Sequence, residues 1–189
     1  VHFLEPNAAD ANGIIDDKDR TIIGDPNPDL TGAWTNVLQH GQLTLEAVCT
    51  FSIGGDVYNA SRQALESMST TNNQSMAVQN RWKVEGQKTT MPRAVFGDPM
   101  GNARFSDRWI EDGSYMKLRT LRLSWKRPVD NTYIEGITLW ASADNLCTFT
   151  HYLGADPETW NGFSVLSQGV DFGLLPACKT FSVGIKLNL

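Results

Sequence analysis

The last residues of the chain alternate between apolar and polar side chains. Every odd position from 181 to 189 is apolar, and the residues between them are small or polar. Successive side chains of a β-strand point to opposite faces of a sheet. This period of two therefore predicts a strand over 178–189 with one apolar face.

Four other segments show the same alternation, and we expect strands near 30–39, 42–53, 114–127 and 134–144. Within the third of these, the apolar residues move from even to odd positions after Leu118. A β-bulge near Arg119 and Thr120 would keep all of them on one face of the sheet.

The connections between the expected strands alternate between short and long. The turns near Gly41 and Pro128 contain few residues, whereas the loops 1–29, 54–113 and 145–177 are long. A transmembrane β-barrel has tight turns at one end and large loops at the other. A strand that crosses the hydrocarbon layer needs about 9–11 residues, which is close to the expected strand lengths. The pattern thus favours a membrane barrel over a soluble sandwich.

The longest connection has a helical pattern near its start. Apolar residues recur at helical spacing from Val57 to Met68, directly after Asp56, a residue type that caps helices. This pattern predicts a helix over 57–69. A second short helix is expected to follow and to reach Trp82.

Five strands in an open sheet leave two edges without hydrogen-bond partners. Such edges cannot face lipid, because their backbone groups would stay unsatisfied there. The chain therefore cannot form a complete barrel. Two interpretations follow: the strands belong to a larger barrel, or the protein is a small soluble sheet.

The composition excludes some classes of function. The chain has 16 basic and 21 acidic residues and a net charge of −5. Nucleic acid is therefore not an expected partner, since binding phosphates requires a basic face. No apolar run approaches the roughly 18 residues of a membrane-spanning helix. The first ten residues show no targeting signal, so we expect a mature or internal piece of a protein.

Catalysis has little support in the sequence. His2, His40 and His151 lie in unrelated segments, without a nucleophile at a recognisable spacing. The carboxylates of Glu111–Asp112 and of Asp156–Glu158 are candidates for a glycosidase pair. The first pair is better explained as an anchor between a loop and the following strand. We expect no enzymatic activity and no cofactor.

The three cysteines are too few for a disulfide scaffold and too far apart for a zinc site, so we expect no metal bound through sulfur. Cys147 and Cys178 flank the last long loop, on strands that we expect to be neighbours. A disulfide between these two residues is therefore a candidate.

Several segments carry a family pattern. They read DRTIIGDPNPDLTGAWTN (19–36), GGDVYNASR (54–62), MPRAVFGDPMGNARFSDRWIEDGSYMKLRTLRLSW (91–125), ASADNLCTFTHYLGADPE (141–158) and GVDFGLLPACKTFSVGIKLNL (169–189). In order and spacing they closely resemble the C-terminal part of the SusC/RagA-like TonB-dependent outer-membrane transporters of Bacteroidetes. The resemblance covers nearly the whole chain.

The resemblance implies an all-β fold for residues 1–189. Antiparallel strands would form the C-terminal part of a 22-stranded transmembrane β-barrel in the bacterial outer membrane, with long extracellular loops that contain a short helical insert. The implied function is the uptake of oligosaccharide or peptide nutrients. The alternative from a different class is a soluble, secreted β-sandwich that binds glycans.

The family also implies partners for this chain. These are a SusD-like surface lipoprotein that closes the barrel as a lid, the remaining barrel strands, the plug and the outer-membrane lipid. The TonB complex would be reached through the N-terminal part of the transporter. Nucleic acid is not among the partners.

Aromatic and charged residues are the candidate binding residues. The aromatic side chains of Trp82, Trp160 and Phe163 in the long loops suit contact with a substrate or with the lid, whereas Trp109 within its shared motif is expected to be structural. One polar set is expected to face the lumen or the plug, although a solvated face explains it equally well. Its members are Glu46, Arg122, Lys126, Asp144 and Lys186.

Two features depart from the family pattern. The segment Asp10–Asp19 reads DANGIIDDKD and is two residues shorter than the Asp- and Gly-rich loop of many members. It lacks a carboxylate that a calcium loop would use, so a cation site and an ordinary turn both remain open. The chain also ends in Leu189, where members usually end in an aromatic residue.

Overall fold

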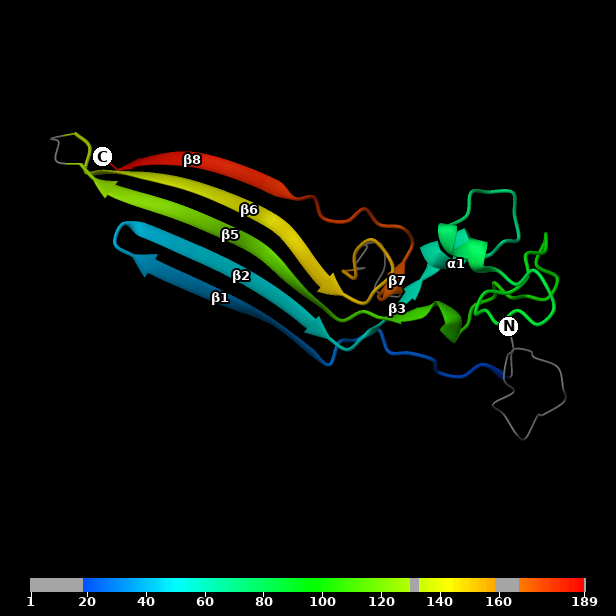
Figure 1. Ribbon diagram of the computed structural model, residues 1–189. Helices are drawn as coiled ribbons and strands as arrows, with labels where there is room; N and C mark the ends of the chain where they lie inside the picture. The colour runs from blue at the N-terminus through cyan, green and yellow to red at the C-terminus, as the bar shows by residue number, and fades with distance from the viewer. Residues whose placement is uncertain (1–18, 130–132, 159–166, 189) are drawn as a thin grey trace.

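The computed structural model describes residues 19–129, 133–158 and 167–188. Its main feature is a five-stranded antiparallel sheet of order β1-β2-β5-β6-β8. Figure 1 shows these strands side by side as one curved sheet, with short turns at one end and the longer connections beyond the other. The strands are β1 (Leu30–His40), β2 (Leu43–Ile53), β5 (Tyr115–Pro128), β6 (Gly136–Thr150) and β8 (Thr180–Asn188).

The strand pairing on both sides of β5 is irregular at one place, beside Arg119. On the β2 side the pairing shifts between Val48 and Cys49, and on the β6 side it shifts between Leu118 and Thr120. The structure thus has the irregularity where the change of parity predicts a bulge. As a result, Met116 and Leu118 lie on the same face as Leu121 and Leu123.

One face of this sheet, which we call the apolar face, carries most of its large aliphatic residues. Their side chains are exposed in this chain: Ile185 keeps 70% and Val183 keeps 84% of its accessible surface. Contiguous apolar surface of this extent marks a contact with lipid or with another protein.

The opposite face, which we call the polar face, carries the candidate lumen residues. Glu46 lies directly opposite Arg122, and both Lys126 and Lys186 are paired with Thr138. Asp144 lies between Thr120 and Thr180 on the same face. The register therefore places all five candidates on one side of the sheet.

The long connections build a second, smaller sheet at the end of the main sheet (Figure 1). Its order is β4-β3-β7, with β4 (Ile110–Asp112), β3 (Asp56–Asn59) and β7 (Val170–Asp171). Beside it lie the helix α1 (Ala60–Glu66) and the 3-10 helices η3 (Met76–Asn80) and η4 (Asp107–Trp109). None of the helices in the described part of the chain is long and apolar enough to cross a membrane.

The predicted helix 57–69 is only partly correct. Asp56 does not cap it, because Asp56 begins β3 and its carboxylate accepts a hydrogen bond from the amide of Asp25 at 2.9 Å. The cap is Asn59, whose side chain accepts from the amide of Arg62 at 2.8 Å. The second expected helix corresponds to the short helix η3, which ends at Asn80.

The predicted strand 134–144 is too short at its C-terminal end. β6 continues to Thr150, so the loop expected to begin at residue 145 begins after it. Asn145 has a positive φ of 55°, and this local irregularity obscures the continuation. Beyond it the pairing resumes, with Cys147 opposite Leu118 and Phe149 opposite Met116 on the apolar face.

The exposed position of Ile185 generates a prediction. In a membrane-embedded sheet, Ile185→Arg would place a cation in hydrocarbon and lower the free energy of unfolding by about 2–4 kcal/mol near the bilayer midplane. Lys186→Gln, one residue further on the polar face, should change it little. Unfolding of the intact protein in lipid vesicles measures both.

Cysteine labelling provides the control for that experiment. Cysteines at 183, 185 and 187 should react with a lipid-soluble reagent and resist a water-soluble one. Equal reaction of the water-soluble reagent at 184, 185, 186 and 187 would contradict a lipid-facing strand.

Candidate functional site

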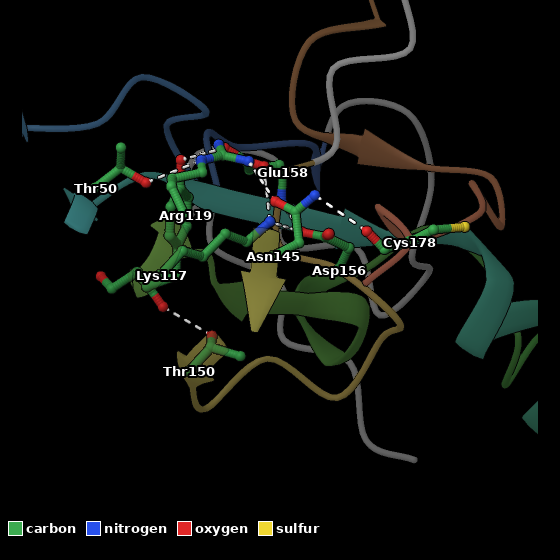
Figure 2. Close-up of polar contacts among 10 residues, drawn as sticks. Thr50, Lys117, Arg119, Asn145, Thr150, Asp156, Glu158 and Cys178 are labelled. Atoms are coloured by element: carbon green, nitrogen blue, oxygen red, sulfur yellow. Dashed lines mark hydrogen bonds and ion pairs between the residues drawn. The ribbon is translucent and has the colours of Figure 1, made fainter. Parts of the chain in front are cut away.

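A cluster of charges lies on the polar face at the loop end of the sheet. Lys117 of β5 is paired with Thr50 and Thr148, which places its side chain opposite to those of Met116 and Leu118. Its Nζ contacts Asp156 Oδ1 at 2.6 Å and Glu158 Oε2 at 2.7 Å (Figure 2). Only 4% of the Lys117 side chain is exposed.

Arg119 supplies the second cation of this cluster. It forms an ion pair with Glu158 and donates through Nε to Thr50 Oγ1 at 3.2 Å. The hydroxyl of Tyr115 also donates to Glu158 Oε1, at 2.9 Å. We call the four charged residues Lys117, Arg119, Asp156 and Glu158 the clasp, since they join the sheet to the connection that follows β6.

The charges of the clasp balance within the cluster. Two cations face two carboxylates, and the amide of Glu158 also donates to Asp156 Oδ1 at 2.9 Å. Burial alone would raise the pKa of Glu158, but hydrogen bonds from Lys117 and Tyr115 and the nearby positive charges outweigh it, so the pKa is lowered. Glu158 is therefore ionised at neutral pH.

The smaller sheet is organised around Trp109, which is completely buried. Its indole Nε1 donates to the carbonyl of Arg104 at 3.0 Å, and the Arg108 guanidinium lies 4.7 Å from the ring centroid. The shared motif predicts a structural role for Trp109, and its complete burial is consistent with that role.

Glu111 connects three segments of this smaller unit. Its Oε1 accepts from Arg62 at 2.7 Å and from Asn59 at 3.2 Å, whereas its Oε2 accepts from the backbone amide of Leu153 at 2.8 Å. The carboxylate therefore joins α1, β4 and the segment after β6. Since both oxygens are engaged, Glu111 has a structural environment rather than that of a free catalytic acid.

Tyr152 and Asp171 form a further buried contact. The tyrosine hydroxyl donates to Asp171 Oδ2 at 2.6 Å, and Asp171 Oδ1 accepts from the amide of Gly173 at 2.7 Å. Burial, followed by the hydrogen bond to Asp171, raises the pKa of Tyr152. This contact thus joins the start of the connection between β6 and β8 to β7, which lies later in the same connection.

The aromatic candidates are not brought together by the described residues. Trp82 is half-buried, and its backbone amide donates to the carbonyl of Met91 at 3.1 Å. Trp160 and Phe163 lie outside the described residues, as does most of the Asp10–Asp19 segment. Contacts of these aromatic side chains with a substrate or lid remain a prediction.

Sequence reasoning missed Lys117, the centre of the clasp. It considered Asp156 and Glu158 as a catalytic pair, but the structure places both carboxylates against Lys117. The sequence did contain a signal for its position. The predicted bulge puts Met116 and Leu118 on the apolar face, so Lys117 between them must lie on the polar face.

The candidate disulfide is not formed in this structure. Cys147 and Cys178 are both free, as is Cys49. Cys147 lies on β6 opposite Leu118, whereas Cys178 precedes the first residue of β8. Within the described ranges, no group of three or more His, Cys, Asp or Glu residues is arranged to hold a metal ion.

Comparison with known proteins identifies the relatives of this chain. It is 33% identical over 187 residues to TonB-dependent receptor P3 of Formosa agariphila, covering 95% of this chain and 18% of that protein. It is 28% identical over 184 residues to TonB-dependent receptor P26 of the same organism, covering 94% and 18%. The chain therefore spans about a fifth of the length of these relatives. No protein-family model matches it.

Solved structures show the same fold. The structure of the RagAB peptide transporter matches with a TM-score of 0.78 at 24% identity, over 92% of this chain and 19% of that one. The RagAB peptide importer in its open-open state matches with a TM-score of 0.72 at 23% identity, over 86% and 17%.

Sequence and fold together define the class of protein. The chain is a homologue of the TonB-dependent receptors, and its sheet is an unclosed part of a β-barrel wall. Its sequence is similar to TonB-dependent receptors and its fold matches that of the RagAB structures, in agreement with the motif resemblance to the SusC/RagA-like transporters.

The lowered pKa of Glu158 generates a prediction about acid stability. A carboxyl group with a lowered pKa in the folded state stabilises the fold fully above its ordinary pKa of 4.5. That contribution is lost as the pH falls through the lower, folded-state pKa. The stability advantage of the wild type over Glu158→Gln should therefore be present at neutral pH and shrink in acid.

Thermal unfolding of the receptor in detergent, between about pH 3 and pH 7, measures this difference. Glu85→Gln, which changes an exposed carboxylate of the β2–β5 connection, is the control. An advantage of the wild type that does not depend on pH would contradict the assigned role of Glu158.

Proposed function

We propose that this chain is the C-terminal wall and loop segment of an outer-membrane importer that takes up peptides or oligosaccharides. The observation that supports this most strongly is the combination of an exposed apolar face, two sheet edges without a partner among the described residues, and large connections at one end. A barrel wall in a membrane explains all three features.

The apolar face would contact lipid and the polar face would line the lumen or contact the plug. On that assignment Glu46, Arg122, Lys126, Asp144 and Lys186 point inward. The cation–π contact of Arg122 with Trp140, 4.7 Å from the ring centroid, shows that charge is accommodated on this face.

The partners follow from the same placement. Further strands would pair with the free edges of β1 and β8, and a SusD-like lipoprotein would cover the large connections from outside the cell. Energy would come from the TonB complex through another part of the receptor. RagAB, whose structures match this fold, is a peptide transporter, which supports peptide as one of the two substrate classes.

The soluble glycan-binding sandwich has less support. A sandwich buries the apolar face of one sheet against a second sheet. In the described part of the chain, the only other sheet has strands of two to four residues and lies at the end of the main sheet.

Deletion of the gene for the intact receptor tests the proposed function. We expect the protein in the outer-membrane fraction. We expect the deletion strain to lose TonB-dependent uptake of tryptic peptides of serum albumin or of a mixture of plant and algal oligosaccharides. Wild-type uptake of both probes in the deletion strain would contradict the proposal.

The aromatic loop residues provide a second test. Trp160→Ala combined with Phe163→Ala should reduce uptake of the probe that the wild type imports by roughly thirtyfold, because each of the two aromatic contacts contributes about 1 kcal/mol. Assembly in the membrane should not change. Tyr133→Ala is the matched control, since Tyr133 is 80% exposed but lies near the short turns at the opposite end. Equal uptake by the two variants would show that these aromatic residues are not contacts.

A further inference from the structure

The chain reverses direction after β6 and returns along β5. Thr150, the last residue of β6, donates through its hydroxyl to the carbonyl of Ser114 at 2.7 Å. The amide of Leu153 then binds Glu111, before the start of β5. Asp156 and Glu158, further along, contact Lys117 and therefore lie back over the polar face.

This path is unusual for a surface loop, because it leads toward the sheet rather than away from it. Glu158 contacts Tyr115, Lys117 and Arg119, which are the first, third and fifth residues of β5. We call residues 152–158 the re-entrant segment. If the polar face lines the lumen, the re-entrant segment stands inside the mouth of the barrel.

The clasp is the charged contact that holds this position. The amide of Leu153 and the hydroxyl of Tyr152 fasten only the beginning of the re-entrant segment. Its end is fastened by Asp156 and Glu158, whose side chains keep 15% and 28% exposure. A partly buried ion pair loses much of its stabilisation when one partner is removed, because the remaining charge is left without compensation.

We propose that Lys117, together with Arg119, is a positioning residue for import, because it holds the re-entrant segment against the lumen wall. This inference rests on the proposed function and adds to it. Substrate would enter past the re-entrant segment, so its position sets how readily substrate is captured. The cations act through Asp156 and Glu158 and need not touch the substrate.

Three variants in the intact receptor separate positioning from stability. Lys117→Met removes the charge and keeps most of the apolar stem, and Lys117→Arg keeps the charge. The triple variant Lys117→Met, Asp156→Asn, Glu158→Gln removes the unpaired carboxylates as well, and so relieves the cost of leaving them without a partner. Lys83→Met is the matched control, because Lys83 is an exposed lysine of the β2–β5 connection and belongs to neither the clasp nor the polar face.

The first measurement is the position of the re-entrant segment. Spin labels on Ala155, which is exposed, and on Ser182 of β8 report the distance between the segment and the wall. We expect one short distance in the wild type, Lys117→Arg and Lys83→Met. A longer or broader distribution is expected in Lys117→Met and in the triple variant.

The second measurement is uptake of the probe that the wild type imports, serum-albumin peptides or the oligosaccharide mixture. Lys117→Met and the triple variant should raise the half-saturating concentration by about tenfold or more, with a smaller change in maximal rate. Thermal stability should fall in Lys117→Met and recover in the triple variant. A purely structural role would make uptake recover together with stability.

Two results would overturn the proposal. One is an unchanged label distance in Lys117→Met. The other is wild-type uptake in the triple variant despite a displaced segment. Failure of the wild type to import either probe would instead contradict the proposed function, and the label distances would still test the clasp.

Discussion

A strand that crosses a membrane must satisfy its backbone N–H and C=O groups through neighbouring strands, because hydrocarbon offers no other hydrogen-bond partners. The strands β2, β5 and β6 meet this requirement on both sides. Among the described residues, β1 pairs only with β2, and β8 pairs only with β6 in the main sheet. In the proposed barrel, further strands would pair with these edges and lipid would cover the exposed apolar face. The long antiparallel ladder follows from this requirement, and the alternation of side chains follows from the different surroundings of the two faces.

The separation of apolar and polar side chains on the two faces depends strongly on the strand register. A slip of one residue would move Arg122 to the apolar face and Leu121 to the polar face. Apolar residues occupy even positions before Arg119 and odd positions after it. The irregularity beside Arg119 therefore keeps Met116 and Leu118, in the N-terminal part of β5, on the apolar face. A break in the repeat thus preserves the separation of apolar and polar surface along the whole strand.

Predictability differed between elements for physical reasons. The alternation of β8 and β2 is local, so both strands could be located from the sequence alone. The extent of α1 could not, because Asp56 and Val57 belong to β3, whose partners Asp112 and Glu111 lie more than fifty residues away. The end of β6 was hidden by the left-handed backbone of Asn145.

The candidate site was less predictable than the fold. The family motifs marked the segments that contain Glu111, Asp156 and Glu158, but spacing along the chain gave no partner for any of them. The ion pair of Lys117 with Glu158 joins residues 41 apart. Register alone indicates that Lys117 shares the polar face, and only the path of the chain after β6 shows which carboxylates reach it.

The bulge and the clasp depend on each other. Without the irregularity, Lys117 and Thr120 would lie on opposite faces, because they are an odd number of residues apart. With it, both face the polar side, and Arg119, between them, also reaches Thr50 and Glu158 on that side. Two cations thereby lie close together at the end of β5 where the long connections begin, and both are compensated by carboxylates there. The feature that keeps leucines on the apolar face therefore also creates the cationic site that the re-entrant carboxylates occupy.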